Sequence, residues 1–274
     1  MSTRIGLSFH ETFPLNRSAM LQLIEVAGQN DGRISRSSLR KHTSLGTNYI
    51  KAMPRYGVGC GIFSGSELTP FGQVLLQHDP TLASDTTQWL MHYHMSAPHG
   101  PGPCYWHHLV THFLRAGNRL SSTDVASEII RTIRNDTGSE PNPRTVGAAA
   151  TVFLRSYAKP EGFCQLRLIQ EVERGLYLVT DPSPVPVWVF GFALVDYWEH
   201  RWGDRITVDL AALFEPGGLS SIFFLGSEAV DELLGTLQRE KLIDVYRVAP
   251  PYQVVRQWGQ DARQMCLDRA YASN

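Results

Sequence analysis

Short apolar stripes at helical spacing mark the first sixty residues of the chain. One stripe predicts a helix over residues 17–29 with a single buried face. Its members stand at i, i+3, i+4 and i+7, as Met20, Leu23, Ile24 and Ala27. Ser35 or Ser37 can cap a second, short helix that runs to about His42, and a third helix begins near Thr47. Three consecutive helices are therefore expected at this end.

A small β-hairpin follows these helices. The sequence predicts a strand at Ile62-Phe63, a turn, a second strand at Glu67-Leu68, and a further helix that Pro70 opens from its first position. Helices followed by a hairpin are the order of elements in a winged helix. Pro54 lies inside the third helix, where it removes a backbone hydrogen bond and is expected to kink or end the helix.

Similar units recur farther along the chain. Helices are predicted over residues 122–135 and from Arg144, and again from Ser227, where a strand over residues 242–248 follows. The fold class is therefore mainly α with small β wings, built from several helix-turn-helix or winged-helix-like modules. We expect an N-terminal winged helix in residues 1–82, a central helical domain in 83–180 and a C-terminal winged-helix-like module in 181–274.

Composition narrows the protein class. The 43% hydrophobic content is enough for folded cores, and the four cysteines lie far apart without a CxxC pair. No apolar stretch approaches the roughly 18 residues of a membrane span, and the first residues lack the apolar run of a signal peptide. We therefore expect a cytoplasmic protein that is neither exported nor membrane-spanning.

Charge is distributed unevenly along a chain whose net charge is only −1. Residues 1–60 carry an excess of five positive charges, whereas residues 196–244 carry an excess of six negative charges. This polarity favours nucleic acid as the partner of the N-terminal end. The C-terminal module presents Glu228, Asp231 and Glu232, which would repel phosphate, so it is interpreted as a structural or partner-binding unit.

The predicted third helix supplies the side chains that could read DNA. Asn can bond an adenine edge, and Lys or Arg can reach guanine or phosphate, while bases on the second helix can bind the backbone. The candidate DNA-binding residues are Arg33, Arg36, Arg40, Lys41, Thr47, Asn48, Lys51 and Arg55. The alternative is a winged helix that contacts protein and whose bases serve solubility.

Histidines gather in the middle of the chain. Six occur within 21 positions: His92, His94, His99, His107, His108 and His112. Cys104, His108 and His112 fall at i, i+4 and i+8, on one face of a predicted helix, where two could hold a metal ion. Aromatic residues interleave with them, so the preferred interpretation is core histidines that bond carbonyl groups or water.

Several motifs resemble one bacterial family. Phe9 to Leu15 reads FHETFPL, and the winged helix with Gly46-Thr47-Asn48 follows it. The further motifs are LTPFG at 68–72, HDP at 78–80 and WLMHYH at 89–94. Together they resemble the SspB-type proteins of bacterial DNA phosphorothioation and related phage-defence systems, over nearly the whole chain.

This resemblance implies a DNA nicking endonuclease that works with a cysteine desulfurase, an ATPase and a sulfur-activating enzyme. His10 and Glu11 are the best candidates for the catalytic pair, as a base or metal ligand and a ligand, with Mg²⁺ or another divalent metal and no organic cofactor. No PD-(D/E)xK, HNH or GIY-type nuclease pattern is visible. Both residues could instead fix the N-terminal segment by bonding backbone, and the protein could be a non-catalytic DNA-binding adaptor or a transcriptional regulator.

Overall fold

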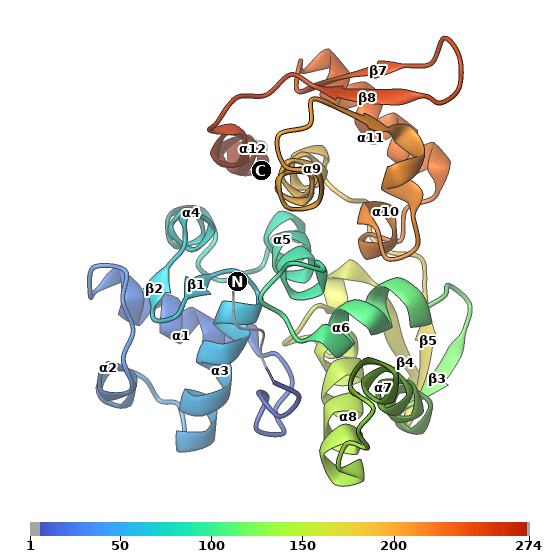
Figure 1. Cartoon of the computed structure of the whole chain (residues 1–274). Coiled ribbons are helices and arrows are strands. Elements are labelled where there is room, and N and C mark those ends of the chain that lie inside the picture. Colours follow the sequence, from blue (N-terminus) through green and yellow to red (C-terminus); the bar gives the residue numbers. More distant parts are fainter. Residues whose placement is uncertain (1–5, 273–274) are drawn as a thin grey trace.

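The computed structural model describes residues 6–272, whose helices and small sheets form three clusters around a central helix, α5 (Asp85–Ser96). Figure 1 shows the first module at lower left, the second at lower right and the third at the top. The fold is mainly α with small antiparallel sheets, as predicted.

The first module contains four helices and one hairpin. They are α1 (Arg17–Gly28), α2 (Arg36–His42), α3 (Thr47–Gly59), β1 (Phe63–Ser64), β2 (Glu67–Leu68) and α4 (Pro70–His78). Ser35 caps α2 in a reciprocal capping box with Ser38, and Pro70 takes the first turn of α4. The predicted elements of this module are confirmed to within one or two residues, except that α3 continues past Pro54.

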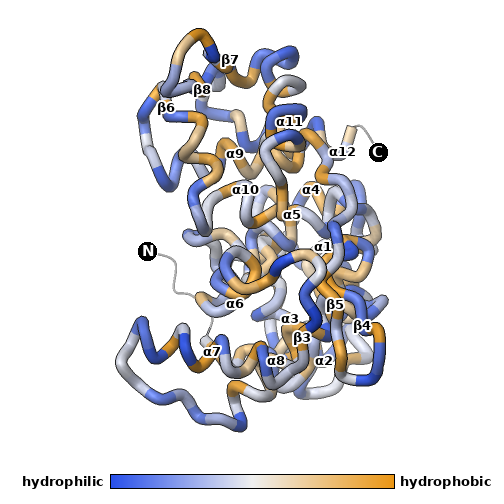
Figure 2. The backbone as a smooth tube through the Cα atoms, turned by 90° about the vertical axis from the view of Figure 1, so that its right-hand side faces the viewer, coloured by the Kyte–Doolittle hydropathy of each residue, from blue (hydrophilic) through white to orange (hydrophobic). Residues whose placement is uncertain are grey.

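The second module follows α5 and is built on two long helices. Its elements are α6 (Cys104–His108), the π-helix η1 (Leu109–Phe113), β3 (Arg119–Ser121), α7 (Ser122–Thr137), α8 (Pro143–Ala158), the 3₁₀ turn η2 (Cys164–Leu166), β4 (Ile169–Glu173) and β5 (Leu176–Val179). Figure 2 shows the hydrophilic connection between α7 and α8.

The third module begins with a helix that is buried along most of its length. Its elements are α9 (Val187–Trp202), β6 (Thr207–Asp209), the 3₁₀ turn η3 (Leu210–Phe214), α10 (Leu219–Ile222), α11 (Ser227–Arg239), β7 (Ile243–Tyr246), β8 (Gln253–Arg256) and α12 (Ala262–Ala272). Because α9 packs against α5, α11 and α12, its apolar stretch forms core.

The three modules share one topology. In the second and third modules a strand precedes the helices that lead into the hairpin, as β3 precedes α7 and α8 and β6 precedes α10 and α11. This strand then pairs with the last strand of the hairpin, giving the orders β3-β5-β4 and β6-β8-β7. The first module reduces that leading strand to a single bridge between Arg33 and Glu67 of β2. In each module the helix directly before the hairpin, α3, α8 or α11, occupies the place of a recognition helix.

Pro54 does not end the third helix. We expected a kink or an end at this residue, but α3 continues for five residues to Gly59. Tyr56, Gly57 and Gly59 are buried, and a Cβ atom at Gly57 would lie 2.6 Å from the Phe63 ring. Burial of this last turn against the hairpin offsets the lost backbone hydrogen bond.

Across residues 6–272, no single helix combines the length and hydropathy needed to cross a membrane. Two segments, 210–222 and 227–239, meet both criteria only when taken together across a 94° bend.

Candidate functional site

The basic residues of α2 and α3 form an exposed face. Arg36, Arg40 and Lys41 are exposed on α2, and Lys51 is half-buried on α3. Among the described residues none of these four takes part in an ion pair. Figure 1 places α2 and α3 at the opposite end of the molecule from α11, so the acidic helix does not cover them. We call these four residues the basic face.

Two other predicted cations are tied to acids. Arg33 forms a 2.7 Å ion pair with Glu67, and Arg55 forms a 3.1 Å ion pair with Glu11. Arg55 also donates a hydrogen bond to the backbone oxygen of Phe9, so it holds the N-terminal segment against α3. The Arg55 side chain is therefore fixed, although Pro54 precedes it in the helix.

The start of α3 presents the remaining predicted contacts. Thr47 and Asn48 are exposed in its first turn, and Gly46 at the N-cap provides no side chain to bind the first backbone N–H groups. These N–H groups carry the positive end of the helix dipole. They lie on α3, which also carries Lys51 of the basic face, and both features favour an anion.

His10 and Glu11 lie in a tight turn at the start of the described chain. The Nδ1 atom of His10 accepts a 2.9 Å hydrogen bond from the backbone N–H of Thr12, and the ring is buried. Burial lowers the pKa of His10 more than the charge of Glu11 raises it, so the ring is neutral near pH 7.

This tautomer limits what His10 can do. With Nδ1 accepting a hydrogen bond, the neutral ring carries its proton on Nε2 and has no free lone pair for a metal ion or a water proton. Glu11 has a positive φ of 45° and is paired with Arg55. These contacts match the structural alternative; a catalytic role for the two residues stays a prediction.

Most of the histidine cluster forms hydrogen bonds inside the fold. His92 on α5 is fully buried, with Nδ1 2.9 Å from the Tyr157 hydroxyl and Nε2 2.8 Å from the backbone oxygen of Ile222. His108 lies 2.6 Å from a carboxylate oxygen of Glu128. Within residues 6–272 the donor atoms of Cys104, His108 and His112 do not gather as a metal-binding group. The hydrogen bonds of His92 and His108 match the interpretation as histidines that bond other groups of the fold.

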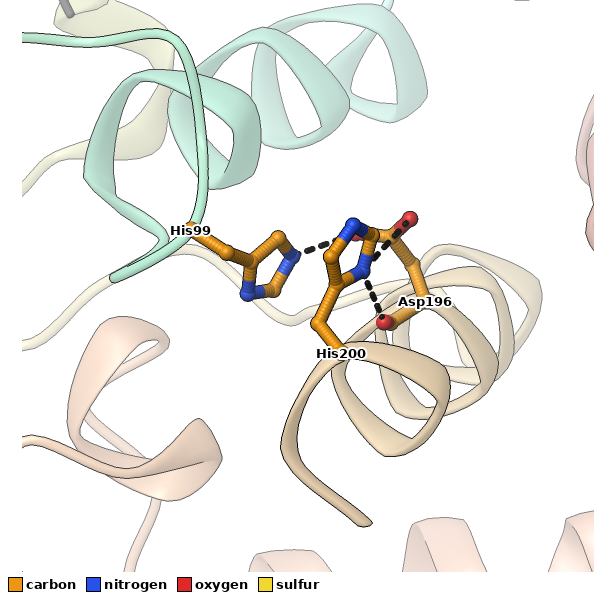
Figure 3. Close-up of side chains that lie close together, drawn as sticks. All are labelled: His99, Asp196 and His200. Atoms are coloured by element: carbon orange, nitrogen blue, oxygen red, sulfur yellow. Dashed lines mark hydrogen bonds and ion pairs between the residues drawn. The ribbon is translucent and has the colours of Figure 1, made fainter. Parts of the chain in front are cut away.

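A different group of polar side chains converges between α5 and α9. Asp196 and His200 lie one turn apart on α9, and His99 reaches them from the loop after α5 (Figure 3). His99 Nε2 is 2.8 Å from Asp196 Oδ2, and the two imidazole rings stack with centroids 3.9 Å apart. One potential donor atom from each of the three residues lies within 4.8 Å of the others.

Asp196 is the centre of this group. Its carboxylate accepts hydrogen bonds from the hydroxyl of Tyr93 at 2.8 Å and from Nη1 of Arg263 at 3.1 Å, besides its contact with His99. Burial raises the pKa of Asp196, but the hydrogen bonds from His99 and Tyr93 and the neighbouring histidines outweigh it and hold the pKa well below its usual range. Asp196 is therefore an anion at neutral pH.

Sequence reasoning did not select Asp196, His200 or Arg263. The i, i+4 spacing of Asp196 and His200 was visible within a helical pattern, but their partner His99 is 97 positions away from Asp196. Asp196 and Arg263 also line a cavity of about 830 Å³, whose other walls come from the first hairpin, α4, α5 and α12.

Comparison with known proteins places the chain in a family. A model of the family DUF4007, described as a protein of unknown function, matches residues 7–271. The chain belongs to the DUF4007 family. A search of curated proteins finds no match. Two crystal structures of SspB are 17% identical in sequence to this DUF4007 chain and cover 97% of it, with 87% of the SspB chain aligned and TM-scores of 0.77 and 0.79. The fold is therefore of the SspB type.

One of these SspB structures is bound to a magnesium ion. Magnesium prefers six oxygen ligands in octahedral geometry. The group formed by His99, Asp196 and His200 offers two imidazole nitrogens and one carboxylate. This donor set does not fit magnesium.

Proposed function

We propose that this DUF4007 protein binds duplex DNA through the basic face in a DNA phosphorothioation system. The observation that carries the proposal is the set of four cations on α2 and α3 that have no acidic partner within residues 6–272, together with the open N-terminus of α3. Cations that have no protein partner are free to replace the counterions of phosphate groups. The SspB-type fold and the sequence motifs support the phosphorothioation system as the context.

Salt dependence tests this proposal. About four phosphate contacts predict that the logarithm of the binding constant falls with the logarithm of salt concentration at a slope of about −3.6. Lys51→Gln should reduce this slope by about one, because it removes one phosphate contact. Lys241→Gln, an exposed lysine after α11, is the matched control and should leave the slope unchanged. A flat salt response of the parent protein would refute DNA binding through this face.

DNA nicking is a second candidate activity, which the SspB-type fold and the resemblance favour. It predicts that the purified protein converts supercoiled plasmid to open circles in the presence of a divalent metal and not with a chelator. His10→Ala and Glu11→Ala should abolish nicking while the circular dichroism spectrum stays unchanged. If both variants nick like the parent, these residues are structural; if the parent never nicks, the protein is an adaptor or a regulator.

The proposed partners follow from the same resemblance. A cysteine desulfurase, an ATPase and a sulfur-activating enzyme would receive the DNA that this protein holds, in the cytoplasm. The acidic third module, with Glu228 and Glu232 exposed on α11, is the proposed contact for such a partner because it does not suit DNA. A pull-down with a variant that lacks these two carboxylates would test it.

A further inference from the structure

We propose that His99, Asp196 and His200 form a binding site for one divalent transition-metal ion of the zinc class. The proposal goes beyond the proposed function and does not rest on it. Two imidazoles and one carboxylate are ligands that Zn²⁺ and its first-row neighbours favour. Three protein ligands would leave a coordination position open for water.

The hydrogen bonds of His200 suit a metal ligand. Its Nδ1 atom lies 2.8 Å from the backbone oxygen of Asp196, and a carbonyl can only accept, so Nδ1 carries the proton. The lone pair of the neutral ring then resides on Nε2. Metal-binding histidines usually donate their other N–H group to a carbonyl or carboxylate in this way, which fixes the ring and its tautomer.

The carboxylate is also held in place. Tyr93 donates a hydrogen bond to Asp196 Oδ2, the oxygen that faces His99 Nε2. Asp196 is buried, whereas the His200 side chain is 45% exposed, so the anion is sheltered and an ion can still enter from solvent. The adjacent cavity of about 830 Å³ gives Asp196 a second route of access. His99 Nε2 donates a proton to Asp196 in the absence of an ion, so binding of a metal ion requires that this proton leave or move to Nδ1. The sheltered carboxylate and the entry path are both present.

Arg263 supplies the positive charge that neutralises Asp196 when no ion is bound. Its Nη1 is 3.1 Å from Asp196 Oδ1, and its Nε is 3.2 Å from Glu199. The Arg263 side chain is half exposed, so it can move away from Asp196 while its ion pair with Glu199 stays formed. A guanidinium beside a divalent ion repels it, and the two cations therefore compete for one carboxylate.

This competition predicts opposite changes in zinc affinity for two variants, a loss in His200→Ala and a gain in Arg263→Gln. The full-length protein is stripped with a chelator and titrated with ZnCl₂ by calorimetry. The parent should bind one ion at this site, and His200→Ala should weaken that binding by at least about 100-fold, whereas His42→Ala, an exposed histidine on α2, should match the parent. Arg263→Gln should tighten binding by about fivefold. Millimolar MgCl₂ should leave the zinc titration unchanged.

Each result decides the proposal. Equal binding by His200→Ala and the parent would place the zinc ion elsewhere, for example on cysteine thiols, and would overturn the proposal. Weaker binding by Arg263→Gln would also count against a competing cation. Because nearly half of the His200 side chain is exposed, its variant should keep the parent's circular dichroism spectrum and change the melting temperature little without metal. Zinc should then raise the melting temperature of the parent but not that of His200→Ala.

Discussion

Helices α3 and α11 occupy the same place in the first and third modules, directly before a two-stranded hairpin. On α3, Asn48 and Lys51 are accessible to solvent, and the exposed cations of α2 nearby form no ion pair with any residue that the structure describes. On α11 the accessible side chains include Glu228 and Glu232. The same order of helix and hairpin therefore presents positive charge in the first module and negative charge in the third.

The third module also neutralises several of its bases. Arg247 pairs with Asp231, Arg201 with Glu215, and Arg269 with Glu240. Such exposed pairs contribute little to stability, but they leave those cations less available to phosphate. The same order of helix and hairpin therefore carries exposed cations in the first module and exposed acids in the third, and under the proposed function this surface charge decides what each helix binds.

The largest expected effect comes from reversing the charge of the basic face. Changing Arg40, Lys41 and Lys51 to Glu removes three phosphate contacts, which at 0.1 M salt corresponds to a loss of at least about 500-fold in affinity for duplex DNA. Fluorescence anisotropy with a labelled duplex measures it.

The matched control applies the same reversal to exposed bases of the third module. Changing Arg205, Arg239 and Lys241 to Glu alters the net charge equally, and affinity should fall by less than about tenfold. Equal losses in the two variants would mean that overall charge, and not the α2–α3 face, binds DNA.

The next effect concerns how the modules are fixed to each other. His92 on α5 contacts the Tyr157 hydroxyl on α8 and the backbone of Ile222 on α10, so it joins the second and third modules. Burial lowers the pKa of His92 to about 4. In the unfolded chain His92 binds a proton near pH 6.5, whereas in the folded protein it stays neutral down to about pH 4. The contribution of His92 to the free energy of unfolding is therefore fully present above pH 6.5 and is lost as the pH falls toward 4.

The size of this loss follows from the shift. Lowering the pH from 7 to 4 should reduce the free energy of unfolding by about 3 kcal/mol through His92. Urea unfolding of the parent and of His92→Gln at both pH values isolates it, since other titrating groups are common to the two proteins. An identical pH dependence in both would show that His92 is not the group that resists protonation.

A gain of binding would sharpen the comparison further. In the background of the Arg40, Lys41 and Lys51 reversal, Glu228→Lys with Glu232→Lys gives α11 two exposed cations. If charge alone separates α3 from α11, affinity for duplex DNA should recover by up to about 60-fold, and the salt slope should steepen by about 1.8. No recovery would mean that the third module holds α11 in a position that DNA cannot reach.

The sequence predicts local structure here better than it predicts the site. The spacing of Met20, Leu23 and Ile24 and the cap at Ser35 depend on neighbours within a few residues, so α1 and α2 could be placed from the sequence. The group around Asp196 depends on contacts between residues that are 67 to 103 positions apart, which periodicity does not contain.

His10 shows a second reason why the site was harder to predict. In the sequence, a histidine next to a glutamate has the residue types that a catalytic pair requires. In the fold, however, the ring closes its own turn onto Thr12, and Glu11 is occupied by Arg55. The chemistry of a residue type is visible in the sequence, but whether its lone pair is free depends on its tautomer and neighbours.

The smallest expected effect concerns Pro54. This proline is a second difference between the two helices, because α3 contains it near its centre and α11 contains no proline. Pro54→Ala supplies a backbone N–H that can close a helical hydrogen bond, so the folded state should gain stability. The unfolded chain also gains freedom, which offsets part of the benefit. We expect a net increase of about 1 kcal/mol, seen as a rise of about 2–4 °C in melting temperature. DNA affinity should stay within about twofold, because the ion pair with Glu11 already fixes Arg55. A clear loss of affinity would instead show that Pro54 shapes the end of α3 for DNA, and the distinction between the two helices would then rest on backbone as well as charge.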